Sequence, residues 1–347
     1  QLHVDPEHPA ATNDDLVDRL ARLSQSGSAI LSLAAQQDRR LAPLIEADYH
    51  YAVPMQSGGR TTGLLLFGGR SDGRDIRGSQ ISFLRSIASQ TASAIEAERL
   101  YEGELERRQV QAELDMARRI QESLLPSTPP KIDGASFAAR SIPARTVGGD
   151  YYDVIRLDDD RFLLLIADVS GKGLPASLYM AELHGMARIV ITPDRSPAAM
   201  LGLLDDRLTD VLEPGAFVTA TIAIVDMQRR TLRMARAGHT PTLLVRNNVI
   251  ERLAPQGLPL GIGRHDLFVE TIEEIEFAVQ TGDRLFFYSD GVTEAMNEEL
   301  ALYGEARLDR TLVDCHDSDP QECLSTLFTD LASHRHEAEQ NDDITML

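Results

Sequence analysis

The sequence feature that most constrains the fold is one unbroken helical stretch near the middle of the chain. Residues 94–125 contain no proline and a single glycine, Gly103. Apolar residues recur there at intervals of three to five among Glu and Arg, which predicts one long helix. Pro126, Pro129 and Pro130 then end it, because proline cannot continue a helix. The pattern predicts two modules joined by a helical linker.

The apolar positions of the linker form an imperfect heptad stripe. They are Leu100, Leu105, Val110, Leu114, Ala117, Ile120 and Leu124. A stripe of this kind favours a coiled coil, so we expect a homodimer through the linker helix. Because the heptad slips, the alternative of a helix that lies along a neighbouring domain stays open.

Length and charge limit the class of protein. A chain of 347 residues with 43% hydrophobic content can bury a sizeable core and is expected to hold about two domains. The balance of 34 Lys and Arg against 54 Asp and Glu gives a formal net charge of -20. This charge would repel a phosphate backbone, so no nucleic acid partner is expected.

The two cysteines and the short apolar runs bear on location. Cys315 and Cys323 are eight positions apart, with no second pair, so neither a disulfide framework nor a zinc site is expected. This usage fits a reducing cytoplasm. The longest apolar runs are strand-sized, so no membrane span is expected. Gln1 is not an initiator Met, which suggests a fragment.

The first module, residues 1–97, is predicted to be of the α+β type. Asp14–Ser24 has the spacing of a helix, and Tyr49–Pro54 and Thr61–Phe67 are β-rich runs around a glycine-containing turn, which predicts a hairpin. Helical spacing then returns over Ile81–Leu100. Residues 98–130 form the linker, and the second module covers 131–347.

The second module has mostly strand-like patterns interrupted by two pairs of helices. The strand candidates are Ser136–Ser141, Tyr151–Arg156, Arg161–Asp168, Phe217–Asp226, Thr231–Ala237, Thr242–Arg246, Leu267–Glu270, Arg284–Ser289 and Ile344–Leu347. The helix candidates are Leu174–Val190, Ser196–Leu212, Tyr303–Val313 and Pro320–His334. Strand runs interrupted by paired helices predict an α+β fold, an α-β-β-α sandwich.

Four aspartates stand at predicted strand edges, where a rigid backbone would present a carboxylate to solvent. They are Asp150, Asp168, Asp290 and Asp342. Hard cations such as Mg²⁺ or Mn²⁺ prefer oxygen ligands of this kind, so the pattern suggests a two-metal hydrolase. Asp153 is a further candidate, and the backbone carbonyl of Val169 could also ligate a cation.

Other polar residues allow two interpretations. Arg145, five residues before Asp150, could bind a phosphate or could simply be solvated. His239 could donate a proton to a leaving group, but a structural role is the preferred interpretation. Lys172 lacks the spacing of a nucleotide-binding loop, and His334 and His336 do not share a helix face.

The first module resembles the second half of a GAF domain. The likeness rests on Ala-Val-Pro-Met, a Gly-Arg turn, Gly-Leu-Leu-Leu-Phe and a closing segment that starts with Ile-Ala-Ser-Gln-Thr. It covers about half of that family's pattern. The resemblance implies a small-molecule sensor or a dimerisation module, with no pocket residues assigned.

Six motifs of the second module resemble, in order, the SpoIIE/RsbU-type branch of the metal-dependent PPM serine/threonine phosphatases. They are Gly-Gly-Asp-Tyr-Tyr-Asp, Ala-Asp-Val-Ser-Gly-Lys-Gly-Leu-Pro-Ala, Ala-Gly-His-Thr-Pro, Gly-Leu-Pro-Leu-Gly-Ile, Tyr-Ser-Asp-Gly-Val-Thr-Glu-Ala and Asp-Asp-Ile-Thr. The match spans about 115–347. Each motif alone is weak, because Asp-Gly and Asp-Asp are common in turns, whereas six in order are specific.

The resemblance implies a site and a partner. Asp150, Asp168, Asp290 and Asp342 fall on metal-ligand positions, and Val169 falls on the position of a carbonyl ligand. The implied cofactors are two Mn²⁺ or Mg²⁺ ions, and the implied substrate is a phosphorylated STAS-domain anti-sigma-factor antagonist. The sensor and linker would regulate activity. The alternative is a catalytically silent, dimeric signalling scaffold with a ligand-binding GAF-like module.

Overall fold

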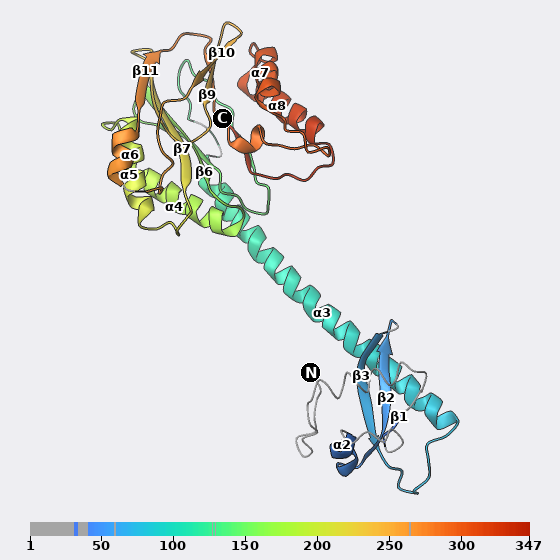
Figure 1. The fold of residues 1–347 in the computed structure, drawn as a ribbon. Helices are drawn as coiled ribbons and strands as arrows, with labels where there is room; N and C mark the ends of the chain where they lie inside the picture. The colour runs from blue at the N-terminus through green and yellow to red at the C-terminus, as the bar shows by residue number, and fades with distance from the viewer. Residues whose placement is uncertain (1–30, 34–40, 59, 127, 129, 264) are drawn as a thin grey trace. The chain divides into compact units, whose positions relative to one another are not determined.

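The computed structural model describes residues 31–33, 41–58, 60–126, 128, 130–263 and 265–347. Contacts divide the chain into two compact units, Gln1–Gln111 and Ala112–Leu347, which are treated separately below (Figure 1). The predicted helix at Asp14–Ser24 lies outside the described residues. Among the helices that the structure describes, none is long and apolar enough to cross a membrane.

The first unit contains a small antiparallel sheet. Its elements are β1 (Leu31–Ser32), α2 (Ala42–Glu46), β2 (Tyr49–Ser57), β3 (Arg60–Gly68) and the beginning of α3 (Ser79–Leu124). The strand order is β1-β2-β3, and the predicted β2–β3 hairpin is confirmed. Ala88 and Ala92 of α3 are fully buried in one cluster with Val53 and Met55 of β2, because small residues let the helix approach the sheet closely.

Helix α3 is a single helix of 46 residues that joins the two predicted helical segments. Much of its apolar stripe is exposed: Leu100 is 67% exposed and Val110 is 56% exposed. Near its end, Leu124 and the following Leu125 pack against the core of the second unit. Coiled-coil pairing and the domain boundaries at 97 and 130 stay predictions.

The second unit contains two layers of strands. The first sheet has the order β11-β8-β7-β6-β5, with all neighbours antiparallel. Its strands are β5 (Tyr151–Arg156), β6 (Arg161–Val169), β7 (Val218–Asp226), β8 (Thr231–Ala237) and β11 (Glu274–Ala278). The second layer contains β10-β9-β12 and β13-β4, joined by the bridge between Tyr288 and Met346. Its strands are β4 (Arg140–Ile142), β9 (Thr242–Arg246), β10 (Val249–Leu253), β12 (Arg284–Phe286) and β13 (Ile344–Met346).

Alternation along β6 explains how the layers stack. Leu163 and Leu165 face a core shared with helices, whereas Phe162 and Leu164 face a core between the two sheets. The first sheet is covered by α4 (Leu174–Val190), α5 (Pro197–Thr209) and α6 (His265–Thr271). The second layer is covered by α7 (Glu305–Asp314) and α8 (Pro320–Arg335) (Figure 1). The predicted α-β-β-α sandwich is confirmed.

Three strand predictions differ from the structure. The predicted strand Arg284–Ser289 ends at Phe286 in β12, and beyond it Tyr288 forms only an isolated bridge. Residues 267–270 belong to helix α6, in which Phe268 is buried while Leu267 and Val269 are about half exposed. An alternating run this short does not distinguish a strand from one turn of an amphipathic helix. Of the predicted strand Ser136–Ser141, only Arg140 and Ser141 are in β4, because β4 pairs with only three residues of β13.

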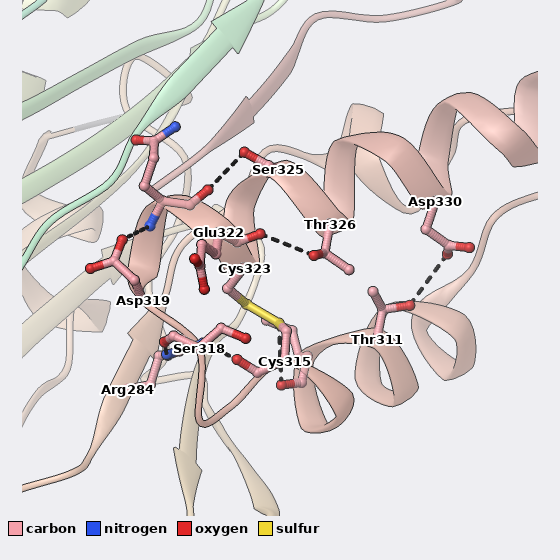
Figure 2. The surroundings of a disulfide bond; sticks show 12 residues. Arg284, Thr311, Cys315, Ser318, Asp319, Glu322, Cys323, Ser325, Thr326 and Asp330 are labelled. Carbon is pink, nitrogen blue, oxygen red and sulfur yellow. Dashed lines mark hydrogen bonds between the residues drawn. A yellow bond between two sulfur atoms is a disulfide. The ribbon is translucent and has the colours of Figure 1, made fainter.

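The expectation of no disulfide was also wrong. Cys315 follows α7 and Cys323 lies in the first turn of α8, and the turn between the helices brings their Cα atoms to 5.2 Å (Figure 2). This separation lies within the range that a disulfide spans, and the two sulfurs are bonded. Arg284 supports the turn by donating hydrogen bonds to the carbonyls of Cys315 and Ser318 (2.8 and 2.5 Å).

Candidate active site

Asp150 and Asp168 lie side by side at one end of the first sheet. Tyr151 of β5 pairs with Ala167 of β6, so Asp150 and Asp168 each stand one position beyond that pair. Facing positions of antiparallel strands are neighbours, so the two carboxylates are close. Asp150 is buried with 4% exposure, and Asp168 is partly buried. The sheet register thus brings together two residues that are 18 apart in sequence.

Glycines allow the other segments to approach. A Cβ added to Gly149 would lie 2.8 Å from the Val169 carbonyl oxygen, so the loop before Asp150 touches the end of β6. A Cβ added to Gly291 would overlap the Asp343 carbonyl oxygen. Only a residue without a side chain fits such contacts. The Asp290-Gly291 turn therefore lies directly on the segment that contains Asp342 and Asp343.

The segments with Asp290 and Asp342 also run antiparallel to each other. Asp290 begins a short 3-10 helix, η3 (Asp290–Val292), directly after Ser289. The Ser289 N–H donates to the Thr345 carbonyl at 3.0 Å, which places the turn beside β13. Asp342 lies two residues before β13 and is partly buried. The structure therefore brings the four predicted aspartates to the same end of the sandwich.

Two further residues fix this arrangement, and the sequence analysis did not single them out. Asp343 is 4% exposed, and its carboxylate accepts hydrogen bonds from the N–H groups of Ala144 (2.7 Å) and Gly149 (2.6 Å). Ser289 is fully buried, and its hydroxyl oxygen lies 2.8 Å from Asp150 Oδ2 and accepts from the Thr345 N–H at 2.9 Å. These contacts tie the loop before Asp150 to the C-terminal segment.

The closeness of the carboxylates affects their pKa values. Burial raises the pKa of Asp168, and the charges of Asp150, Asp290, Asp342 and Asp343 raise it further. Burial and the Asp343 charge raise the pKa of Asp150. Burial, Glu294 and Asp342 raise the pKa of Asp290. Like charges held this close favour protonation or a bound cation.

The donor chemistry fits a divalent cation. Asp150 Oδ1 is buried and has no hydrogen-bond partner among the described residues. Carboxylate oxygens are the ligands that Mg²⁺ and Mn²⁺ prefer. As the side chains stand, however, no three His, Cys, Asp or Glu side chains in the described part of the chain are grouped closely enough to hold an ion. Lys172 Nζ instead lies 2.8 Å from Asp342 Oδ2.

The other predicted residues have different surroundings. Arg145 is exposed, and its Cδ would lie 3.3 Å from a Cβ at Gly173, so it runs beside the loop after Asp168. Val169 is 1% exposed, and its carbonyl faces Gly149. His239 is buried with Nδ1 2.8 Å from Thr219 Oγ1, and burial followed by Arg236 lowers its pKa to about 3. A buried, neutral His239 fits the structural interpretation.

Asp153 does not face the aspartate cluster. It lies three positions after Asp150 along an extended segment, so its side chain is on the opposite face. Its Oδ2 instead lies 2.8 Å from Arg188 Nη2, on helix α4. The suggestion that Asp153 joins the site is therefore wrong.

The last turns of α3 also contact the loop before Asp150. The Gln121 amide donates from Nε2 to the Gly148 carbonyl (2.6 Å) and accepts at Oε1 from the Gly148 N–H (3.1 Å). Gly148 is two residues before Asp150. The end of the linker helix is therefore hydrogen-bonded to the backbone that positions Asp150.

A solved structure has a similar fold. The second module is similar to the SiaA-PP2C domain of Pseudomonas aeruginosa, with a TM-score of 0.62 and 25% identity over 69% of this chain and 96% of that one. The fold and the aspartate-lined end of the sandwich together define a phosphatase domain of the PP2C, or PPM, type.

Sequence comparisons give the family. The model of Stage II sporulation protein E (SpoIIE) matches residues 158–347, more than half of the chain. The chain belongs to the SpoIIE family. Asp168, Asp290 and Asp342 lie inside the matched region, whereas Arg145 and Asp150 precede it.

Two curated relatives match a longer part of the chain. Phosphoserine phosphatase RsbU of Bacillus subtilis (strain 168) is 26% identical over 69% of this chain and 70% of its own length. Protein IcfG of Synechocystis sp. is 28% identical over 68% of this chain. The match spans only 41% of the length of IcfG.

Proposed function

We propose that this chain is a metal-dependent protein phosphatase that hydrolyses phosphoserine or phosphothreonine on a partner protein. The observation that carries the proposal is the meeting of four separate acidic segments at one end of the sandwich. They contribute Asp150, Asp168, Asp290 and the Asp342–Asp343 pair. Such a cluster repels itself, so two divalent cations would stabilise it.

The proposed ligands are the four predicted aspartates and the Val169 carbonyl, and the proposed ions are Mn²⁺ or Mg²⁺. When bound, the ions would supply an activated water and offset the charge of the phosphoryl oxygens. Ser289 holds one oxygen of Asp150, and Oδ1 has no hydrogen-bond partner in the part of the chain that the structure describes. Asp342 would exchange Lys172 for a cation.

Two other residues have proposed roles around the ligands. Both carboxylate oxygens of Asp343 accept hydrogen bonds from the N–H groups of Ala144 and Gly149. Its proposed role is therefore to hold the loop before Asp150 rather than to ligate an ion. Arg145 is exposed beside the loop after Asp168, and its guanidinium would bind the substrate phosphate through paired hydrogen bonds.

The proposed substrate is a STAS-domain anti-sigma-factor antagonist that carries phosphoserine. Support comes from the likeness to RsbU, whose name states that it is a phosphoserine phosphatase. The net charge of -20 opposes nucleic acid as a substrate. A phosphoprotein is compatible with this charge because cations and Arg145 would receive the phosphate locally.

We also propose that the N-terminal module regulates the phosphatase through α3. Exposed apolar residues along α3, such as Leu100, Val110 and Ile120, favour pairing with a second copy of the helix. The hydrogen bonds between Gln121 and Gly148 connect the end of this helix directly to the loop before Asp150. Pairing or a signal that rotates α3 would therefore change how Asp150 is presented.

The rival function is a scaffold that binds a partner without catalysis. The structure disfavours it, because a silent scaffold has no reason to retain four mutually repelling aspartates together with buried groups that hold them. Hydrolysis of p-nitrophenyl phosphate with Mn²⁺ discriminates the two functions. We expect the wild type to hydrolyse it and Asp290→Asn to lose at least about 100-fold in rate, because a metal ligand is lost. Equal rates, or silence from both proteins, would contradict the proposal.

A further inference from the structure

An ion pair between a buried carboxylate and a half-exposed Arg links β5 to α4 and belongs to neither the proposed ligands nor the substrate site. Asp153 is 1% exposed. Its Oδ2 lies 2.8 Å from Arg188 Nη2 and accepts from the Tyr151 hydroxyl at 2.9 Å, while Oδ1 accepts from the Val154 N–H at 2.8 Å. Both carboxylate oxygens are therefore bonded, which a buried charge requires.

A second contact lies one helical turn away. His184 precedes Arg188 by four residues, so both side chains lie on one face of α4. The His184 ring meets the Tyr151 ring edge to face, with ring centres 5.6 Å apart. Tyr151 therefore contacts both Asp153 and His184, and α4 is fixed on β5 at two successive turns.

Both linked elements begin at the proposed metal site. Strand β5 begins directly after Asp150, and α4 begins at Leu174 after the short loop 170–173, which follows Asp168 and Val169 at the end of β6. The two elements also approach each other at that end, where a Cβ on Gly149 would lie 3.1 Å from Ala176 Cβ. A change in the angle between β5 and α4 would move the loop after Asp168 relative to the loop before Asp150, because packed elements move as rigid bodies.

We propose that Asp153 and Arg188 are positioning residues that set the distance between the loop before Asp150 and the loop 170–173 after Asp168. The inference rests on the proposed function, since the loops are those of the proposed metal site. Neither residue ligates a cation or touches substrate. Loss of Arg188 leaves the Asp153 charge buried with the Tyr151 hydroxyl and one N–H as its remaining partners, so α4 would shift to let water reach it.

The second unit offers a matched control pair. Asp283 has a side chain that is 6% exposed and receives two hydrogen bonds from Arg246, at 2.7 and 2.6 Å. Arg246 ends β9, and Asp283 precedes β12 by one residue and Asp290 by seven. This pair is also a buried carboxylate with a partly exposed Arg, but it links neither β5 nor α4.

The test measures Mn²⁺ binding and stability on the full chain. Wild type, Arg188→Gln, Arg188→Lys and Arg246→Gln are freed of metal with chelator, titrated with Mn²⁺ by calorimetry, and unfolded in urea. We expect Arg188→Gln to weaken Mn²⁺ binding about fivefold and to lower stability. Arg188→Lys should recover most of the affinity because it keeps the charge. Arg246→Gln should lower stability while the Mn²⁺ affinity stays that of the wild type.

Two results would overturn the inference alone. The first is that Arg188→Gln loses stability but binds Mn²⁺ with the affinity of the wild type, because the ion pair would then have only a structural role. The second is that Arg246→Gln weakens Mn²⁺ binding as much as Arg188→Gln does, because the loss of affinity would then follow from general destabilisation. A wild type that binds no Mn²⁺ would overturn the proposed function, and this inference with it.

Discussion

At the scale of single residues, neighbours in sequence have different tasks at this site. Asp342 is partly exposed and pairs with Lys172, whereas Asp343 is buried and accepts from two backbone N–H groups. Ser289 and Asp290 differ in the same way, because the hydroxyl of Ser289 turns inward to Asp150. The motifs therefore combine proposed ligands with the residues that hold other ligands in place.

Ser289→Ala should test whether Ser289 orients Asp150 for metal binding without being a ligand itself. The change leaves one oxygen of buried Asp150 without its donor, which is expected to cost about 1.5 to 3 kcal/mol of unfolding free energy. Mn²⁺ affinity should fall about 10-fold to 100-fold, as for other groups that orient ligands. Urea unfolding and calorimetry measure the two effects.

Ser325→Ala is the control for this prediction. Ser325 is exposed on α8, and its hydroxyl donates only to the Gln321 carbonyl of the same helix. This variant should match the wild type in both measurements. Normal Mn²⁺ affinity in Ser289→Ala would show that the hydroxyl does not orient Asp150.

The sequence indicated the four aspartates that the structure brings to one end of the sandwich, but not the residues that hold them there. An aspartate at the end of an apolar strand can be recognised from the local sequence, as at Asp168 and Asp290. The partners of Ser289 and Asp343 lie 139 and 194 residues away, and no local pattern indicates such pairs. The only hints in the sequence to these supporting residues were the second aspartate of the Asp342-Asp343 pair and the serine directly before Asp290.

At the scale of elements, long periodic segments were predicted well and short ones were not. Leu174–Val190 and Thr231–Ala237 have the predicted bounds, because each contains several repeats of its period. The edge strands β10 and β11 were missed, since each has only five residues and two of them are charged. The cysteine pair was missed because the turn between α7 and α8, not a sequence motif, brings it together.

Helix α3 gives a prediction at this scale. Gln121→Ala removes both hydrogen bonds to Gly148, so the loop before Asp150 should loosen and Mn²⁺ affinity should change by about 2-fold to 30-fold. Calorimetric titration of the full chain measures the change. Arg119→Ala, an exposed change two residues earlier, is the control and should leave affinity as in the wild type. Equal affinities in all three proteins would refute control of the site through this contact.

At the scale of the whole molecule, the chain combines a phosphatase unit of the SpoIIE family with an N-terminal α+β module. The first sheet presents Asp150 and Asp168 at the end where α4 begins, and the second layer presents Asp290 and Asp342. No single layer holds the complete proposed ligand set. The function therefore depends on the packing of the two sheets against each other, which forms the core between them.

The most direct test of this account is phosphate release from a STAS-domain protein that carries phosphoserine. Wild type and Asp168→Asn are each assayed with Mn²⁺ and with EDTA. The account predicts release by the wild type with Mn²⁺ alone, and a loss of at least about 100-fold in Asp168→Asn. Release that persists in EDTA, or that survives the substitution, would contradict a metal-dependent phosphatase built on these aspartates.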